Sequence, residues 1–425
     1  MTRRTLLLGG PSTLLLALLL ASNISALQPR APAQWVTAWG TSQHALGGTA
    51  LSNATVRMVA RVTIQGEAVR IRLDNSYGIG PVTIGKAHIG WRRTGATIFP
   101  GSNQEVTFKG APDVTISAGG SVVSDPVRLK VLARQDLAVS LYIPAAGVLP
   151  SQHVNTGVTS YTTPNSAGNV TADETGTPFS NTTAAGLWLK SIDVLSSEAM
   201  GAVVAFGDSI TDGACASRDG YERWSDWLAL RLDLERRHIA VVNEGIGGNT
   251  LLAKLPEPYR AATATAAAIP NSTTPGLERL DRDALSHSGV THAILFLGTN
   301  DLRRSATADM LREGMLDVIK RVKARGIKIL GVTAIPRHNT APDVTSPWDS
   351  VKTKRRNELN EWIRTKAPFD AVLDFDAVVR HAANPDLINP VFDCDGVHPT
   401  PRGYYEMGQA VQLDLFARPG LIRSR

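Results

Sequence analysis

Two short segments, far apart in the chain, carry side chains whose types can act together in catalysis. Gly-Asp-Ser at 207–209 directly follows an apolar run, and Asp-Gly-Val-His at 395–398 lies near the carboxyl terminus. A serine hydroxyl is a poor nucleophile at neutral pH, so it needs an imidazole to accept its proton, and a carboxylate must orient that imidazole. The pattern predicts a serine hydrolase in which Ser209 is the nucleophile, His398 the base and Asp395 the acid that orients the base.

Each of these residues also has a purely structural interpretation. A serine after a strand is a good helix cap, an aspartate before a glycine suits a turn, and a histidine can simply be a hydrogen-bonded part of the interior. His398 precedes Pro399, which disfavours helical geometry at the histidine and places it in a loop ahead of a helix. Because the chain supplies all three chemical types, the catalytic interpretation is favoured over three separate structural ones.

The second half of the chain alternates between predicted strands and predicted helices. Such alternation indicates a parallel sheet with helices on both faces, whose sites lie beyond the carboxyl ends of the strands. Ser209, the segment 243–248 and Asn300 all follow strands, so we expect them to meet at one edge of the sheet. The predicted strands are 202–206, 239–243, 292–297, 328–333 and 371–375, and the predicted helices are 222–236, 277–285, 308–325, 351–366 and one from residue 402.

Four short motifs in this half resemble those of the SGNH/GDSL hydrolase family, whose signature residues are Ser, Gly, Asn and His on separate blocks. They are Gly-Asp-Ser at 207–209, Asn-Glu-Gly-Ile-Gly-Gly-Asn-Thr at 243–250, Gly-Thr-Asn-Asp at 298–301 and Asp-Gly-Val-His-Pro at 395–399. Each motif is short, but all four occur in the family's order, and the resemblance covers roughly residues 200–415. The serine lies in Gly-Asp-Ser-Ile-Thr and not in the Gly-x-Ser-x-Gly of a nucleophile elbow. The resemblance implies an α/β hydrolase domain with a parallel sheet in a flavodoxin-like, three-layer arrangement.

The same resemblance implies an oxyanion hole. Hydrolysis of an ester passes through a tetrahedral oxyanion, which needs preset hydrogen-bond donors. The family assigns this role to the backbone amides of Ser209 and Gly248 and to the side-chain amide of Asn300. Gly247 competes with Gly248 by a shift of one residue, and both glycines also suit a tight turn.

Neither a metal nor an organic cofactor is expected. The sequence contains no zinc-binding spacing, and the proposed chemistry needs only side chains and water. We expect Asp208 and Asp301, which flank two of the signature residues, to brace loops and not to act in catalysis.

The first half of the chain consists of short alternating segments separated by turn residues. Apolar residues recur at every second position from Val56 to Ile64, and the alternation resumes from Val69 to Leu73 after Gln-Gly-Glu at 65–67, which predicts a β-hairpin. The sequence therefore predicts an all-β sandwich, jelly-roll-like, over residues 27–198, followed by the hydrolase domain over residues 199–425. Further predicted strands are 81–84, 87–91, 105–108, 127–131 and 137–143, with a loop at 164–183.

The first 26 residues have the pattern of a signal peptide. Arg3 and Arg4 precede an apolar run at 14–21, and small residues follow at 25–26. The segment also loosely resembles a twin-arginine export signal. The apolar run is short for a membrane span, although an uncleaved membrane anchor stays open as an alternative. We expect a secreted or periplasmic protein with no stable membrane span after processing.

The charge balance argues against a nucleic-acid partner. A formal net charge of +6 over 425 residues is a weak bias for so large a surface. The densest basic cluster, at 352–356, falls in a helical pattern without interleaved aromatic residues, which indicates a solvent-exposed helix face. The expected partner is an acylated small molecule or polysaccharide, and nothing in the sequence fixes the oligomeric state.

The two cysteines flank the predicted catalytic residues. Cys215 lies six residues after Ser209, and Cys394 directly precedes Asp395. If Ser209 and His398 meet, the two sulfur atoms are brought into the same neighbourhood, and in an oxidising compartment a disulfide is expected. Two unpaired buried thiols are the alternative.

The leading functional hypothesis is a secreted serine ester hydrolase that cleaves short-chain acyl esters, chiefly acetyl esters, on small molecules or polysaccharides. A β-sandwich joined to an SGNH domain resembles some exported carbohydrate esterases that remove acetyl groups from plant cell-wall polysaccharides. Lipases and arylesterases share the core, so lipid and aryl esters stay open as substrates, as does acyl transfer to a glycan. A non-catalytic glycan-binding protein is a further alternative, with Trp35, Trp39, Trp91 and Tyr77 available for sugar stacking, but the complete catalytic set argues against it.

Overall fold

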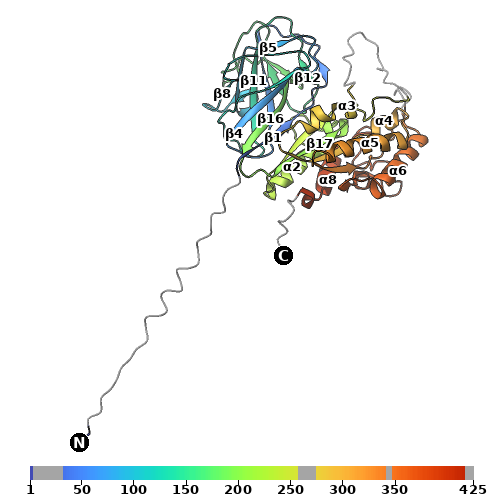
Figure 1. Ribbon diagram of the computed structural model, residues 1–425. Coiled ribbons are helices and arrows are strands. Elements are labelled where there is room, and N and C mark those ends of the chain that lie inside the picture. The colour runs from blue at the N-terminus through green and yellow to red at the C-terminus, as the bar shows by residue number, and fades with distance from the viewer. Residues whose placement is uncertain (3–31, 257–273, 341–346, 417–425) are drawn as a thin grey trace. The chain divides into compact units, whose positions relative to one another are not determined.

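A parallel sheet of five strands positions the predicted catalytic residues. The computed structural model describes residues 1–2, 32–256, 274–340 and 347–416 (Figure 1). The strand order is β18-β17-β19-β20-β21. Of these five strands, the one that comes first in the sequence, β17, lies between the second and the third. This is the order of a doubly wound sheet, in which sites form where the strand order reverses. The strands are β17 (Gly201–Gly207), β18 (Ile239–Gly245), β19 (Val290–Phe296), β20 (Lys328–Val332) and β21 (Ala371–Leu373).

Helices bury both faces of this sheet, because successive side chains of a strand point in opposite directions. Val203 and Ala205 of β17 lie in a buried cluster with apolar residues of α2 (Trp224–Leu234) and α8 (Pro401–Ala410). Val204 and Phe206 lie in a second cluster with residues of α5 (Ala308–Lys323) and α6 (Ser350–Thr365). Every residue of β17 is buried, which explains why its sequence is a continuous apolar run.

The predicted strands and helices of this half are confirmed, with shifts of a few residues at their ends. The segment predicted as a helix at 277–285 is α3 (Gly276–Leu280) followed by one π-helical turn at Asp281–Leu285. Four short helices complete the described part of this half: α1 (Ser209–Asp212), α4 (Thr299–Arg303), α7 (Phe375–Val379) and a 3₁₀ turn at Leu413–Phe416.

The first half of the chain forms antiparallel sheets, as predicted. One has the order β1-β16-β4-β10, and a larger one has the order β14-β13-β3-β11-β6-β7, with β8 also paired to β6. Apolar side chains of both sheets share one buried cluster. The strands are β1 (Gln34–Gly40), β3 (Ala54–Arg61), β4 (Ala68–Asp74), β6 (Lys86–Thr94), β7 (Thr97–Ile98), β8 (Gln104–Val106), β10 (Ser121–Val123), β11 (Asp136–Ile143), β13 (Ser160–Thr162), β14 (Asn181–Thr183) and β16 (Leu189–Ser196). Two smaller sheets consist of β2 (Ala45–Leu46), β12 (Ser151–His153) and β15 (Gly186–Leu187), and of β5 (Val82–Ile84) and β9 (Val114–Ile116).

The predicted β-hairpin between residues 56–64 and 69–73 is wrong. β3 pairs with β11 and β13, whereas β4 pairs with β16 and β10, so the two strands belong to different sheets. The connection between them does not close a hairpin turn, because Gly66 donates its N–H to the carbonyl of Val131 and not to a residue of β3. Alternation tells which side of a strand is buried, but it does not identify the partner strand. The predicted strand 127–131 is likewise reduced to isolated bridges at its two ends.

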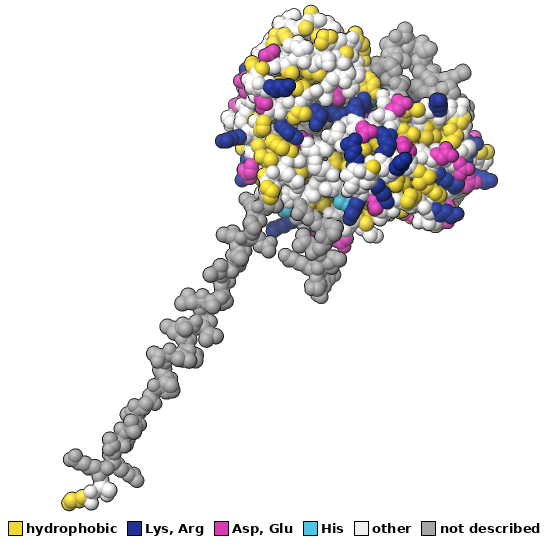
Figure 2. All heavy atoms as spheres, in the orientation of Figure 1, with side chains coloured by type: hydrophobic (Ala, Val, Ile, Leu, Met, Phe, Trp, Pro, Cys, Tyr) yellow, Lys and Arg dark blue, Asp and Glu magenta, His cyan; other side chains and the backbone are white. Residues whose placement is uncertain are grey.

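The basic cluster at 352–356 is also not the fully exposed helix face that was predicted. Lys352 and Arg356 are buried. Arg356 reaches Asp386 at 3.2 Å, and Lys352 donates to the carbonyl of Pro347 at 2.8 Å. Their exposed neighbour Lys354 shows that the cluster wraps around α6. On the face of the molecule in Figure 2, basic side chains lie interspersed with acidic ones.

The two halves of the chain meet inside one unit, which comprises residues 33–425. The chain passes from β16 to β17 through residues 197–200, where the predicted domain boundary falls. Ser42 lies in the first half of the chain (residues 32–198, called the β region below). It donates a hydrogen bond to Glu244 of β18 at 2.5 Å, and both side chains are buried. No helix in the described ranges is long and apolar enough to cross a membrane. The predicted signal peptide falls almost wholly in residues 3–31, outside the described residues.

Candidate active site

Ser209 begins a short helix at the carboxyl end of β17. The strand ends at Gly207, where a Cβ atom would lie 2.1 Å from Thr211 Oγ1, so only glycine fits. Asp208 caps the helix, since its side chain accepts the N–H of Ile210 at 3.0 Å. Burial raises the pKa of Asp208 to about 7. The cap fixes the first turn and therefore the direction of the Ser209 hydroxyl.

The three predicted catalytic side chains are in hydrogen-bond contact. Ser209 Oγ lies 2.8 Å from His398 Nε2, and His398 Nδ1 lies 2.8 Å from Asp395 Oδ2. The other carboxylate oxygen accepts the backbone N–H groups of Val397 at 3.0 Å and His398 at 2.9 Å. Burial disfavours the carboxylate, but the hydrogen bonds and charge of His398 outweigh burial and lower the pKa of Asp395 to about 2. Asp395 is therefore ionised at neutral pH.

The loop that carries Asp395 and His398 is fastened to the loop after Ser209. Cys215 and Cys394 form a disulfide, which confirms the prediction. Tyr404 of α8 donates its hydroxyl to the carbonyl of Ala214 at 2.7 Å. Gly396 has a φ of +79°, a conformation that favours glycine, and its N–H donates to Asp393 at 2.7 Å.

The three predicted oxyanion donors also lie at this edge of the sheet. Residues 246–249 form a turn, closed by the N–H of Asn249 on the carbonyl of Ile246, in which Gly248 has a φ of +71°. Within the described residues, no acceptor takes the backbone N–H of Ser209 or Gly248. Asn300 donates from Nδ2 to the carbonyl of Asn249 at 3.0 Å, which ties the third motif to the second.

Asp301 braces the segment beyond that turn, as expected. Its two oxygens accept the backbone N–H groups of Leu251 and Leu252, each at 2.9 Å. The carboxyl group is fully buried, and burial raises its pKa to about 6.

Comparison with known proteins agrees with this geometry. Residues 205–405 match the GDSL-like Lipase/Acylhydrolase family. This part of the chain is a GDSL-like hydrolase domain. The match begins in β17 and ends in α8, so it contains all four motifs. The match to this family supports an ester hydrolase.

Several solved structures are similar to the GDSL domain. A carbohydrate acetylesterase family member from Sinorhizobium meliloti is 18% identical with a TM-score of 0.37, covering 51% of this chain and 99% of that chain. A lipolytic protein of the G-D-S-L family from Veillonella parvula is 18% identical with a TM-score of 0.35, covering 49% and 94%. A GDSL-like lipase from Bacteroides thetaiotaomicron is 19% identical with a TM-score of 0.33, covering 49% and 85%. No curated protein sequence matches the chain.

Arg337 is a residue of the GDSL domain that the sequence analysis missed. It follows β20 at the same edge of the sheet, and its Nη1 donates to Asn300 Oδ1 at 3.4 Å. This contact fixes the orientation of the Asn300 side-chain amide, because the amide oxygen faces Arg337 and the amide nitrogen faces the turn at 246–249. Burial lowers the pKa of Arg337 to about 9, and the side chain stays cationic at neutral pH. The position of Arg337 after a strand of the parallel sheet is the sequence feature that could have identified it as a site residue.

The β region forms part of the wall of a cavity beside Ser209, which the sequence did not predict. A cavity of about 400 Å³ beside Ser209 is lined on one side by His44, Asn155 and Gly157 of the β region. The other side comes from the GDSL domain and includes Asp212, Gly213, Ala214, Ala216 and Gly247. Small side chains of the GDSL domain lie next to Ser209, and Val154 and Arg218 are the larger nonpolar and charged side chains of the lining.

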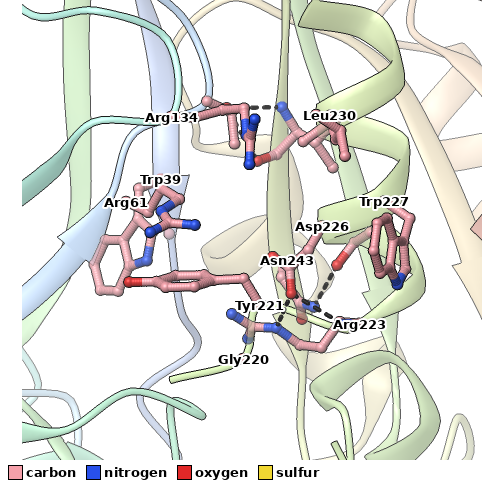
Figure 3. Close-up of a pocket in the computed structure, with 15 residues that line it drawn as sticks. Trp39, Arg61, Arg134, Gly220, Tyr221, Arg223, Asp226, Trp227, Leu230 and Asn243 are labelled. Atoms are coloured by element: carbon pink, nitrogen blue, oxygen red, sulfur yellow. Dashed lines mark hydrogen bonds and ion pairs between the residues drawn. The ribbon is translucent and has the colours of Figure 1, made fainter. Parts of the chain in front are cut away.

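A second cavity, of about 140 Å³, marks another junction between the β region and the GDSL domain (Figure 3). Arg61 of β3 lies over the ring of Tyr221 with its guanidinium 3.3 Å from the ring centre, and both side chains contact Asp136. None of the catalytic side chains lines this cavity. Trp39 lines this cavity and Trp91 packs against the core, and both side chains are half-buried.

Among the described residues, one cluster of side chains at the site offers atoms of the types that bind metal ions. Cys215 Sγ, Asp395 and His398 offer atoms within 4.8 Å of one another. The sulfur, however, is bonded to Cys394. Of the two imidazole nitrogens of His398, Nε2 contacts Ser209 and Nδ1 contacts Asp395. These residues do not fit a metal ion, because a ligating cysteine must be a free thiolate.

Proposed function

We propose that this protein is a secreted serine ester hydrolase that removes short acyl groups, chiefly acetyl, from hydroxylated small molecules or polysaccharides. The observation that carries the proposal is the continuous line of contacts from Ser209 Oγ through the His398 ring to Asp395, with both distances at 2.8 Å. Such a line is what a serine needs to become a nucleophile at neutral pH.

In the acylation step, Ser209 Oγ attacks the carbonyl carbon of the ester while His398 Nε2 accepts its proton. Asp395 keeps the proton of the neutral ring on Nδ1 and stabilises the imidazolium that forms. The tetrahedral intermediate then collapses, His398 gives its proton to the leaving alcohol, and an acyl group stays on Ser209. A water molecule, activated by the same imidazole, attacks the acyl group and releases the acid.

The oxyanion of each tetrahedral intermediate is bound by the N–H groups of Ser209 and Gly248 and by Nδ2 of Asn300. A donor of this kind contributes about 3–4 kcal/mol to transition-state stabilisation when it is fixed in advance. The turn at 246–249 holds the N–H of Gly248 in place without substrate, and the contact with Arg337 does the same for Nδ2 of Asn300. Two of the three donors are therefore fixed in advance.

The cavity supports a short acyl group and a polar alcohol. Gly213, Ala214 and Ala216 contribute only small side chains to the cavity, while His44, Asn155, Asp212 and Arg218 offer polar contacts. The disulfide supports export to an oxidising compartment, together with the amino-terminal pattern of basic and apolar residues. The strand order and the helices on both faces support a flavodoxin-like, three-layer arrangement of the GDSL domain, and the two larger antiparallel sheets support a jelly-roll-like sandwich.

The test compares the protein with its Ser209→Ala variant on p-nitrophenyl acetate, butyrate and octanoate and on acetylated xylan. We expect the wild type to prefer acetate and to deacetylate the polysaccharide, and the variant to lose activity on every substrate. Activity confined to long chains would contradict the short-acyl assignment. Full activity of the variant would contradict the serine mechanism.

A further inference from the structure

One histidine of the β region is held rigidly beside the nucleophile. His44 directly precedes β2, and its backbone N–H donates to the carbonyl of Gln152 in β12 at 2.9 Å. Its ring packs edge-on against the ring of His153, with 4.6 Å between the ring centres. The side chain is only slightly exposed, and the surface that it does expose lines the same cavity as Ser209.

The partners of His153 show which nitrogen of His44 carries a proton. His153 Nδ1 lies 2.9 Å from the carbonyl of Ser42, and Nε2 lies 3.1 Å from the carbonyl of Asn155 and 3.0 Å from Asp212 Oδ1. These oxygens only accept hydrogen bonds, so both nitrogens of His153 must donate and the ring is an imidazolium. His44 Nδ1 lies 3.1 Å from His153 Nδ1 and therefore accepts, which leaves the proton of the neutral His44 ring on Nε2.

The electrostatics of the pair agree with this assignment. Burial, followed by the adjacent His153, lowers the pKa of His44 to about 3, against the opposing effects of Asp212 and of the Ser42 backbone. Burial also opposes ionisation of His153, but the charge and hydrogen bond of Asp212 outweigh it and raise the pKa of His153. Asp212 is the last residue of α1, the helix that begins at Ser209, so the same helix holds the nucleophile and fixes the His44 tautomer.

The Nε2–H group of His44 is available to a ligand. Among the described residues it has no hydrogen-bond partner, and it is not one of the fully buried unpaired polar atoms. The atom is therefore open to the cavity that it lines. A donor held there without a protein partner is satisfied by water or by an acceptor on the ligand.

The chemistry of a short ester identifies that acceptor. The carbonyl oxygen of the ester is bound by the oxyanion donors, and the bridging oxygen receives the proton of His398. An acetyl group has no further oxygen, so any remaining acceptor belongs to the alcohol. We propose that His44 Nε2–H donates a hydrogen bond to a hydroxyl or ring oxygen of the alcohol part, and that the β region thereby selects hydroxylated alcohols such as sugars. This inference rests on the proposed hydrolysis at Ser209.

The test measures a ratio of specificity constants for two acetate esters of similar size. One is a mono-O-acetylated methyl xyloside, and the other is cyclohexyl acetate, which has a six-membered ring without hydroxyl groups. His44→Phe keeps a ring but removes the donor, and His44→Leu removes both. His44→Gln places an N–H near the position of Nε2. His88→Phe makes the same substitution at a buried histidine of β6 that does not line the cavity.

We expect His44→Phe and His44→Leu to lower the ratio of kcat/KM for the xyloside to kcat/KM for cyclohexyl acetate by roughly three- to tenfold, the loss for one neutral hydrogen bond. His44→Gln should restore most of the ratio, and His88→Phe should leave it at the wild-type value. An unchanged ratio in a folded, active His44→Phe or His44→Leu protein would overturn the inference. A wild-type protein that hydrolyses neither ester would instead overturn the proposed function.

Discussion

Asn300→Ala removes one of the three proposed oxyanion donors without touching the catalytic serine, histidine or aspartate. In the structure, one N–H of Asn300 is used by the carbonyl of Asn249 at 3.0 Å, and its oxygen accepts from Arg337. The second N–H is the one that would meet the developing oxyanion. Loss of such a donor costs about 3–4 kcal/mol, so we expect kcat on p-nitrophenyl acetate to fall by a factor of about 10²–10³. KM should change little, because the donor acts mainly in the transition state.

The substitution also affects stability, and this effect must be separated from catalysis. Without Asn300, the carbonyl of Asn249 and one N–H of Arg337 each lose a partner, which costs about 1–3 kcal/mol of unfolding free energy. Asn360→Ala is the matched control. Asn360 is also buried and makes two hydrogen bonds to the backbone of Ala334 at 2.8 Å, and no hydrogen bond joins it to Ser209, His398 or Asp395 among the described residues.

Steady-state kinetics of both variants, with thermal unfolding of each, decides the matter. The reasoning predicts that both variants lose stability, but that only Asn300→Ala loses kcat by more than tenfold. A fall in kcat of less than about fivefold, or an equal fall in the two variants, would refute the assignment of Asn300 to the oxyanion hole.

Three further predictions follow from the same site. Breaking the Cys215–Cys394 disulfide with a reductant should lower kcat and the unfolding temperature together, since a link across 179 residues contributes about 5 kcal/mol at most in the chain-entropy treatment; unaltered kinetics with two alkylated thiols would contradict it. Gly248→Ala should lower kcat and destabilise the protein by about 1–2 kcal/mol, because a φ of +71° is strained for alanine although nothing lies near the added methyl group; wild-type kcat would contradict it. Asp208 holds its proton in the folded state up to pH about 7 but loses it near pH 4 when unfolded, so its contribution to stability is lost as the pH rises between these values. Asp208→Asn keeps the cap and should flatten this pH dependence in urea unfolding, whereas an unchanged pH dependence would contradict it.

The sequence placed three of the four motifs at one edge of the sheet because these three follow strands, and the carboxyl ends of parallel strands meet at one edge. Burial of β17 on both faces made its apolar run easy to recognise. The hairpin prediction failed because the alternation in β3 and β4 shows which faces are buried but not which strands pair.

Two contributions to the site could not be predicted for a related reason. His44 reaches the cavity only because β2 pairs with β12 and brings His153 to its side. Arg337 faces Asn300 through a loop that has no periodic pattern. Contacts of this kind depend on the folded path of the chain, which local sequence does not encode.

The most direct test of the central claim is to identify the residue that becomes acylated. The protein is treated with a fluorophosphonate or quenched during turnover of p-nitrophenyl acetate, digested, and analysed by mass spectrometry. The account predicts one adduct on the peptide that contains Ser209, absent from Ser209→Ala and slower to form in His398→Ala. An adduct on another serine of the active protein, or an inhibitor that abolishes activity while Ser209 stays unmodified, would contradict it.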